Sequence, residues 1–197
     1  MSEAKVFKLV AFNGSPHRNG ATAQLMNFVI DELKKEGVEC ELIHLCDYDK
    51  IRGCRGCYAC TGHTKCMAAA PDDPINSHIE KILASDCVMI GSPTHYANVS
   101  VATKSLIDRA GLVASSNGHL YKGKIGVPII SAMRNGTRSA YNAIDSFFSF
   151  EQMPVASVDW NTGISMKEGE ILKEEGTKEN LTKLAQQILF MLQKLRA

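Results

Sequence analysis

Short apolar runs alternate with amphipathic stretches along this chain. Residues 6–12 form an apolar run with the length and composition of a buried β-strand. In residues 23–35, by contrast, Leu25, Val29 and Leu33 recur at helical spacing, which predicts a helix with one buried face. The same pattern predicts further strands at 38–45, 87–90, 125–131 and 155–160, and further helices at 75–83, 100–110, 138–150 and 178–195.

Strands that alternate with helices are typical of a parallel α/β sandwich. With five strands, the natural candidate is a doubly wound sheet of order 2-1-3-4-5 with helices on both faces. We predict a single domain over residues 1–197, because a chain of this length is long enough for one full core. Residues 46–74 lack apolar periodicity and form a cysteine-rich loop, and we expect the charged residues 167–178 to be a solvated loop.

The turn after the first predicted strand has the composition of an anion site. It is rich in glycine and polar side chains, and it leads into the start of a helix, whose free N–H groups attract anions. Ser15 and Thr22 offer hydroxyls, while Asn19 offers an amide and Arg18 a full charge. We interpret the turn as a phosphate-binding loop. The alternative is a polar connection in which Ser15 or Asn19 only caps the helix.

Three common phosphate motifs are excluded at this loop. The P-loop of nucleotidases requires its glycines one residue closer together and a lysine where Ala21 stands. The dinucleotide fingerprint G-x-G-x-x-G is missing, and the loop has no cysteine that could act as a phosphatase nucleophile. The phosphate therefore belongs to another class of ligand.

The loop after the third predicted strand opens on the same crevice of a 2-1-3-4-5 sheet. Residues 92–99 combine a proline, the aromatic ring of Tyr96 and several amide or hydroxyl donors. Such a loop suits a flat heteroaromatic ligand with polar edges. Phosphate at one loop and a flat ring at the next describe a mononucleotide.

The two loops together resemble those of the flavodoxin-like FMN-dependent reductases. The motifs are G-S-P-x-R-N-G-x-T after the first strand and G-S-P-T-x-Y after the third. The resemblance covers most of the chain and implies a flavodoxin-like fold with FMN as the ligand. It implies that the phosphate is held by Ser15, Arg18, Asn19, Ala21 and Thr22, and that the isoalloxazine ring is lined by Pro93, Thr94, His95, Tyr96, Ala97 and Asn98. The family's third, glycine-rich loop corresponds here to residues 133–137, which contain one glycine.

Four cysteines fall within thirteen residues at the spacing C-x2-C-x2-C-x5-C. Zinc sites normally use two C-x2-C pairs separated by a dozen or more residues, whereas three cysteines at x2 spacing are similar to the bacterial ferredoxin motif. The arrangement resembles that of the iron–sulfur flavoproteins, a branch of the same family. It implies a [4Fe-4S] cluster bound by Cys54, Cys57, Cys60 and Cys66. Free thiols and a zinc site are the open alternatives.

The motifs together predict a flavin-dependent oxidoreductase that passes electrons between a [4Fe-4S] cluster and FMN. NAD(P)H, a quinone or ferredoxin fits as the electron donor or acceptor. No side chain is an evident acid–base catalyst, and we interpret His17 and His95 as exposed loop histidines. One alternative is an NAD(P)H-dependent FMN or quinone reductase without a working cluster. Another is a non-catalytic flavodoxin-like electron carrier, against which the balance of 22 basic and 21 acidic residues argues.

Charge and composition limit the possible binding partners and the expected cellular location. The formal charge of +1 gives no general attraction to nucleic acid or anionic membranes, and no apolar run approaches the ~20 residues that span a bilayer. The first residues lack a signal-peptide pattern, so we expect a cytoplasmic protein. The resemblance implies a homodimer or homotetramer. The candidate subunit contacts are Phe147, Phe148 and Phe150. The three cysteines outside the motif are expected to be small buried hydrophobic residues, namely Cys40, Cys46 and Cys87.

Overall fold

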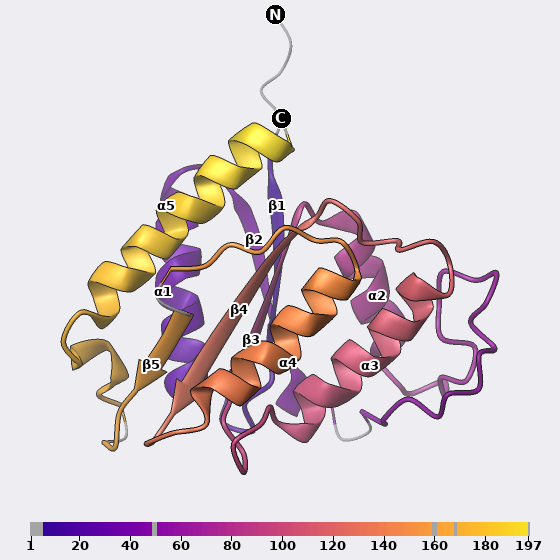
Figure 1. The fold of residues 1–197 in the computed structure, drawn as a ribbon, viewed down its shortest axis with the longest axis horizontal. Helices are drawn as coiled ribbons and strands as arrows, with labels where there is room; N and C mark the ends of the chain where they lie inside the picture. Colours follow the sequence, from indigo (N-terminus) through magenta and orange to yellow (C-terminus); the bar gives the residue numbers. More distant parts are fainter. Residues whose placement is uncertain (1–5, 49–50, 159–160, 168, 197) are drawn as a thin grey trace, which may run out of the picture.

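The computed structural model describes residues 6–48, 51–158, 161–167 and 169–196, and these contain a five-stranded parallel sheet of order β2-β1-β3-β4-β5 (Figure 1). The strand order confirms the predicted flavodoxin-like doubly wound fold. The strands are β1 (Lys8–Asn13), β2 (Glu39–His44), β3 (Cys87–Pro93), β4 (Ile125–Ala132) and β5 (Thr162–Ile164).

Helices cover both faces of the sheet (Figure 1). On one face, α1 (Ala21–Lys35) and α5 (Thr177–Leu195) pack over side chains such as Leu9, Met89 and Val127. The other face is covered by α2 (Ile75–Ala84), α3 (Val101–Ser115) and α4 (Thr137–Phe150). Every residue of β4 is buried, as expected for a parallel strand that is covered on both faces. None of the described helices combines the length and apolarity needed to cross a membrane.

The predicted fifth strand is wrong in position. Residues 155–158 form only an isolated bridge, between Val155 and Gly126, and residues 159–160 lie outside the described residues. Asn161 explains the shift, because its backbone is left-handed (φ 48°) and its side-chain amide donates to the carbonyl of Pro128 in β4 over 3.0 Å. The ladder with β4 therefore starts only at Thr162.

Two smaller expectations also need correction. The charged segment 167–178 is not uniformly solvated, because it contains the 3₁₀ turn η3 (Ile171–Lys173), whose Ile171 is buried in the core beneath α1 and α5. Of the three phenylalanines proposed as a subunit contact, Phe147 and Phe148 are buried within this chain. Only Phe150 remains exposed.

His78 on α2 is a buried histidine with an unusual environment. Neither ring nitrogen has a hydrogen-bond partner among the described residues, and the ring makes edge contacts with Phe12 and Tyr48 at centroid distances of 5.4 and 5.1 Å. Burial lowers the pKa of His78 to about 4, because the charged imidazolium is poorly solvated there.

Replacing His78 with leucine is expected to make the protein more resistant to acid. The unfolded chain binds the proton near pH 6.5, the folded protein only near pH 4, so stability is lost as the pH falls through this interval. The loss is about 3 kcal/mol by pH 4 and should disappear in His78→Leu. Urea unfolding at about pH 7 and about pH 4 measures it, with the exposed His17→Leu as control. An equal loss of stability in His78→Leu and wild type would contradict this assignment.

Candidate functional site

A first candidate site is a cleft at the carboxyl ends of β1 and β3, where the strand order reverses. It has a volume of about 320 Å³ and is bounded by the segments that follow β1, β2 and β3 and by the first turn of α3. Ser15 and His95 line it, in agreement with the prediction that the loops after the first and third strands meet at one crevice. The residues after β2 that sequence reasoning missed are Leu45, Cys46, Tyr48 and Ile51. The predicted strand order could have indicated these residues, because β2 is the neighbour of β1 and also ends at this edge.

Backbone and hydroxyl groups hold the loops after β1 and β3 together. The amide of Gly14 donates to the carbonyl of Gly91 over 2.8 Å, and the Ser100 hydroxyl donates to the carbonyl of Gly14 over 2.7 Å. The Ser100 amide in turn donates to Ser92 Oγ over 2.9 Å. A Cβ on Gly14 would collide with the Thr103 hydroxyl, so only glycine allows this close approach. The position of α3 relative to the cleft is therefore fixed.

The phosphate-loop turn is shaped by its own side chains. The Ser15 amide donates to Asn13 Oδ1 over 3.0 Å, and the His17 amide donates to Ser15 Oγ over 3.1 Å. Helix α1 begins after Gly20, and no side chain caps it. The alternative in which Ser15 or Asn19 caps the helix is therefore wrong. The N–H groups at the start of α1 have no side-chain cap to compete with an anion.

His44 at the end of β2 supports this turn. Its Nδ1 lies 3.0 Å from the side-chain nitrogen of Asn13. Burial and the neighbouring Arg18 charge lower the pKa of His44, so the ring stays neutral and accepts this hydrogen bond.

Two of the predicted phosphate ligands already have partners. Arg18 is exposed and forms an ion pair with Asp47, which follows β2, and the hydrogen bond from Arg18 lowers the pKa of Asp47. Thr22 is buried, with its hydroxyl 2.7 Å from Ser131 Oγ at the end of β4. Asn19 is exposed.

The predicted ring-binding loop contains a strained turn. The amide of His95 donates to the carbonyl of Asn98 over 2.8 Å, and the reverse bond measures 3.1 Å. The two central residues, Tyr96 and Ala97, are both left-handed, with φ values of 47° and 58°. Hairpin turns of this kind normally use Asn or Gly, and each such non-glycine residue costs ~1–3 kcal/mol. The Tyr96 side chain is fully exposed beside the cleft-lining His95.

The loop after β4, residues 133–137, packs against this turn. Gly136, the single glycine in residues 133–137, is left-handed (φ 87°), and a Cβ there would lie 2.6 Å from the Cα of Ala97. Glycine is thus required at this position, where the loop meets the strained turn.

A second candidate site lies in the cysteine-rich loop, where one hollow of about 100 Å³ is lined by all four motif cysteines. The sequence grouped these cysteines by spacing alone, and the folded loop brings them around the same space. Cys54 and Cys57 are exposed, Cys66 is half-buried and Cys60 is buried. The far wall of the hollow belongs to α3, through Arg109, Leu112 and Val113.

Two asparagine side chains hold the loop in this form. Asn117, just after α3, donates to the carbonyls of Cys60 and His63 over 2.9 Å and accepts from the Gly62 amide over 2.7 Å. Asn76 on α2 accepts from the Cys66 amide over 2.7 Å and donates to the Cys66 carbonyl over 3.2 Å. The cysteine loop is therefore anchored to two helices by polar contacts as well as by the burial of Cys60. Sequence reasoning missed both anchors, because nothing in the local spacing signals them.

The chemistry of the hollow can be tested against the group that the cysteines imply. Three arginines line it, namely Arg52, Arg55 and Arg109, and the lining carboxylate of Asp73 is paired with Arg109. Positive charge beside four thiolates suits an anionic metal cluster.

A single metal ion fits the side chains of this hollow less well than a cluster does. Within the described part of the chain, no three His, Cys, Asp or Glu side chains come close enough to hold one ion. Four zinc ligands converge on one point at Zn–S distances of ~2.3 Å. The ligands of a polynuclear cluster bind different irons and stand farther apart, so the residues present fit a cluster better than a zinc ion.

The remaining cysteines match their expected role in part. Cys87 is fully buried in β3, and burial raises the pKa of the half-buried Cys40 to about 11, so both are un-ionised thiols. Cys40 and Cys46 are each only half-buried, and Cys46 departs further from the expectation because it lines the first cleft.

Comparison with known proteins assigns the family. The family model described as NADPH-dependent FMN reductase matches residues 7–166. An iron–sulfur flavoprotein of Archaeoglobus fulgidus is 39% identical over 130 residues, which cover 66% of this chain but only 61% of that relative. An iron–sulfur flavoprotein of Methanocaldococcus jannaschii is 26% identical over 198 residues, which cover 95% of this chain and 100% of the relative.

Solved structures show the same fold at lower identity. RosB with bound 8-demethyl-8-formylriboflavin-5'-phosphate superimposes with a TM-score of 0.76 at 15% identity, over 97% of this chain and 81% of that one. At that identity the likeness concerns the fold alone. The family match covers most of the chain, and the chain therefore belongs to the NADPH-dependent FMN reductase family of flavin-dependent oxidoreductases.

Proposed function

We propose that this protein binds FMN in the cleft at β1 and β3, binds a [4Fe-4S] cluster through the cysteine loop, and passes electrons between the two. One observation carries the proposal. All four motif cysteines line a single hollow against α3, and the first turn of the same helix lines the cleft.

The FMN phosphate belongs at the turn between β1 and α1. Ser15, Arg18 and Asn19 supply a hydroxyl, a charge and an amide, and the uncapped start of α1 at Ala21 and Thr22 supplies backbone N–H groups. The Thr22 hydroxyl is already hydrogen-bonded, so Thr22 contributes through its amide. Arg18 must exchange Asp47 for the phosphate, which is a modest requirement for an exposed ion pair.

The isoalloxazine ring belongs in the cleft beside this turn. The residues proposed to line the ring are Pro93, Thr94, His95, Tyr96, Ala97 and Asn98. Tyr48 joins them from the segment after β2, because its ring borders the same space. Aromatic and amide groups at the rim of an apolar cleft suit a flat ring with polar edges.

The two sites are close enough to work together. Val101 lines the cleft and Arg109 lines the cysteine hollow, and eight helical residues correspond to about 12 Å along α3. Ile51 and Arg52, adjacent in the sequence, also line the cleft and the hollow respectively. When bound, FMN exchanges electrons in pairs or singly and the cluster exchanges them one at a time. The protein's share is to hold both groups, neutralise their charge and limit their contact with water.

The external electron partner is proposed as NAD(P)H, a quinone or ferredoxin, and the assembly as a homodimer or homotetramer. A second candidate function is an NAD(P)H-dependent FMN or quinone reductase without a working cluster. It is favoured by one observation, the match over residues 7–166 to a family model that is described as NADPH-dependent FMN reductase without mention of a cluster.

Arg18 in the phosphate turn and its partner Asp47 after β2 are expected to differ in their importance for FMN binding. Arg18→Ala should weaken FMN binding roughly ten- to a hundredfold, because a charge-assisted contact to the phosphate is lost. Asp47→Ala should leave binding unchanged or tighten it by less than about fivefold, because it frees Arg18 from a weak exposed pair. Flavin-fluorescence titration of the apoprotein measures both. Riboflavin, which has no phosphate, is the control ligand, and riboflavin binding as tightly as FMN would rule out the phosphate turn.

Serine substitution of the cysteines is expected to divide them into two groups. Each of Cys54→Ser, Cys57→Ser, Cys60→Ser and Cys66→Ser should lower the iron content of anaerobically prepared protein, since an iron ligand is removed while the flavin cleft is left intact. Cys87→Ser is the matched control, because Cys87 is buried in the sheet, away from the hollow. It should cost stability and leave iron per chain unchanged. Equal iron loss in the control and in Cys57→Ser would refute the cluster assignment.

A further inference from the structure

Arg109 is a buried charged side chain at the wall of the cysteine hollow. It lies on the third turn of α3, and its side chain is only 4% exposed. Burying a guanidinium is unfavourable unless its N–H groups find partners. The identity of those partners therefore indicates its role.

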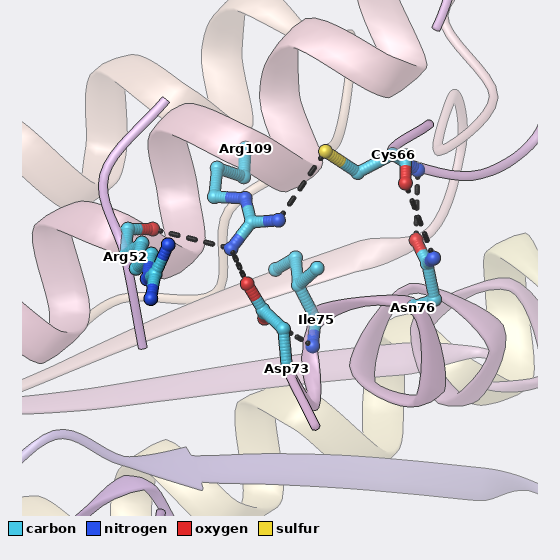
Figure 2. A network of polar contacts seen from close by, with 6 residues as sticks. All are labelled: Arg52, Cys66, Asp73, Ile75, Asn76 and Arg109. Carbon is cyan, nitrogen blue, oxygen red and sulfur yellow. Dashed lines mark hydrogen bonds and ion pairs between the residues drawn. The ribbon is translucent and has the colours of Figure 1, made fainter. Parts of the chain in front are cut away.

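Figure 2 shows Arg109 reaching between two parts of the hollow. One terminal nitrogen donates to the sulfur of Cys66 over 3.3 Å. The other donates to the carboxylate of Asp73 and, over 3.3 Å, to the backbone carbonyl of Arg52. The guanidinium thus joins a motif cysteine to a buried carboxylate.

Both partners are fixed independently of Arg109. The Cys66 backbone is held on both sides by the Asn76 side chain, and Asp73 accepts a hydrogen bond of 3.1 Å from the Ile75 amide at the start of α2 (Figure 2). The contact between Arg109 and Cys66 is therefore built into the loop. A planar guanidinium can serve both partners at once, which the single ammonium group of a lysine cannot do in the same way.

A donor at this sulfur has an electrostatic consequence for a bound cluster. One-electron reduction makes a thiolate-ligated cluster more negative, and hydrogen bonds to its sulfurs and nearby positive charge favour the more negative state. Asp73 acts in the opposite sense, because its carboxylate offsets part of the Arg109 charge. Burial strengthens both effects relative to an exposed charge.

We propose that Arg109 is a positioning residue that fixes the Cys66 sulfur and raises the reduction potential of the cluster, with Asp73 limiting the rise. The inference rests on the proposed function, since it concerns the same cluster. A purely structural ion pair between α3 and the segment before α2 would hold the loop without changing the potential.

The experiment is a redox titration of the cluster, followed by electron paramagnetic resonance, in anaerobically purified protein. The variants are Arg109→Gln, Arg109→Lys and Asp73→Asn, with Lys104→Gln as control. Lys104 lies on the same helix and carries the same charge, but its side chain is 54% exposed and borders a different groove. Iron and labile sulfide per chain are measured on each sample first.

We expect Arg109→Gln to lower the equilibrium constant for one-electron reduction at least tenfold, which is about 59 mV for one electron. Arg109→Lys should give a smaller decrease, Asp73→Asn should shift the potential upward, and Lys104→Gln should shift it by much less than Arg109→Gln. If Arg109→Gln does not fold, the opposite shifts of Arg109→Lys and Asp73→Asn decide the matter.

Unchanged potentials in iron-replete Arg109 variants would overturn this inference and leave the proposed function standing. Loss of iron from all three variants, with the fold retained, would also overturn it, because Arg109 would then be needed for cluster binding rather than for its potential. Wild-type protein without iron would instead overturn the proposed function itself.

Discussion

Helix α3 is held at both ends by polar groups, and the two candidate sites take their positions from it. At its start, Ser100 bonds to Gly14, which follows β1, and to Ser92, the second-last residue of β3. Farther along, Arg109 in the third turn and Asn117 just after the helix bond to the cysteine loop. Because the helix backbone is stiff over this length, the distance between cleft and hollow is set by residue count along one element. A flavin and a cluster bound there have a fixed separation.

The two sites are stabilised by different means. The proposed flavin cleft is formed at the ends of deeply buried strands, so the sheet can support a left-handed turn at Tyr96 and Ala97 that would be unfavourable in a free loop. The cysteine loop has little apolar content and relies on Asn76, Asn117 and Arg109 for its shape. A metal cluster would add four covalent ties to a segment that otherwise depends on a few hydrogen bonds.

Much of this arrangement could be predicted from the sequence, because it depends on patterns between residues that are close together along the chain. Apolar periodicity predicts the helices and the first four strands to within a few residues, and the two G-S-P motifs predict the edge at which the cleft opens. The fifth strand was misplaced because the carbonyl of Pro128 is taken by the side chain of Asn161, a contact that spacing does not reveal.

The residues that the sequence missed act over long distances along the chain. Tyr48 reaches the cleft because β2 lies beside β1, and Asn117 meets Cys60 across 57 residues. In the sequence, Arg109 cannot be distinguished from the other charged residues of predicted helices. Its contact with Cys66 becomes visible only in the folded structure. The pairing of Arg18 with Asp47 is of the same kind, since each residue belongs to a different loop at the cleft.

We propose that one chain carries both a flavin and an iron–sulfur cluster. The most direct test of this proposal is the content of iron, labile sulfide, zinc and FMN in protein purified without exposure to air. We expect about four iron and four sulfide per chain together with one FMN, and a broad brown absorption beneath the flavin bands. One zinc per chain without iron, or a yellow protein with flavin bands alone, would contradict it.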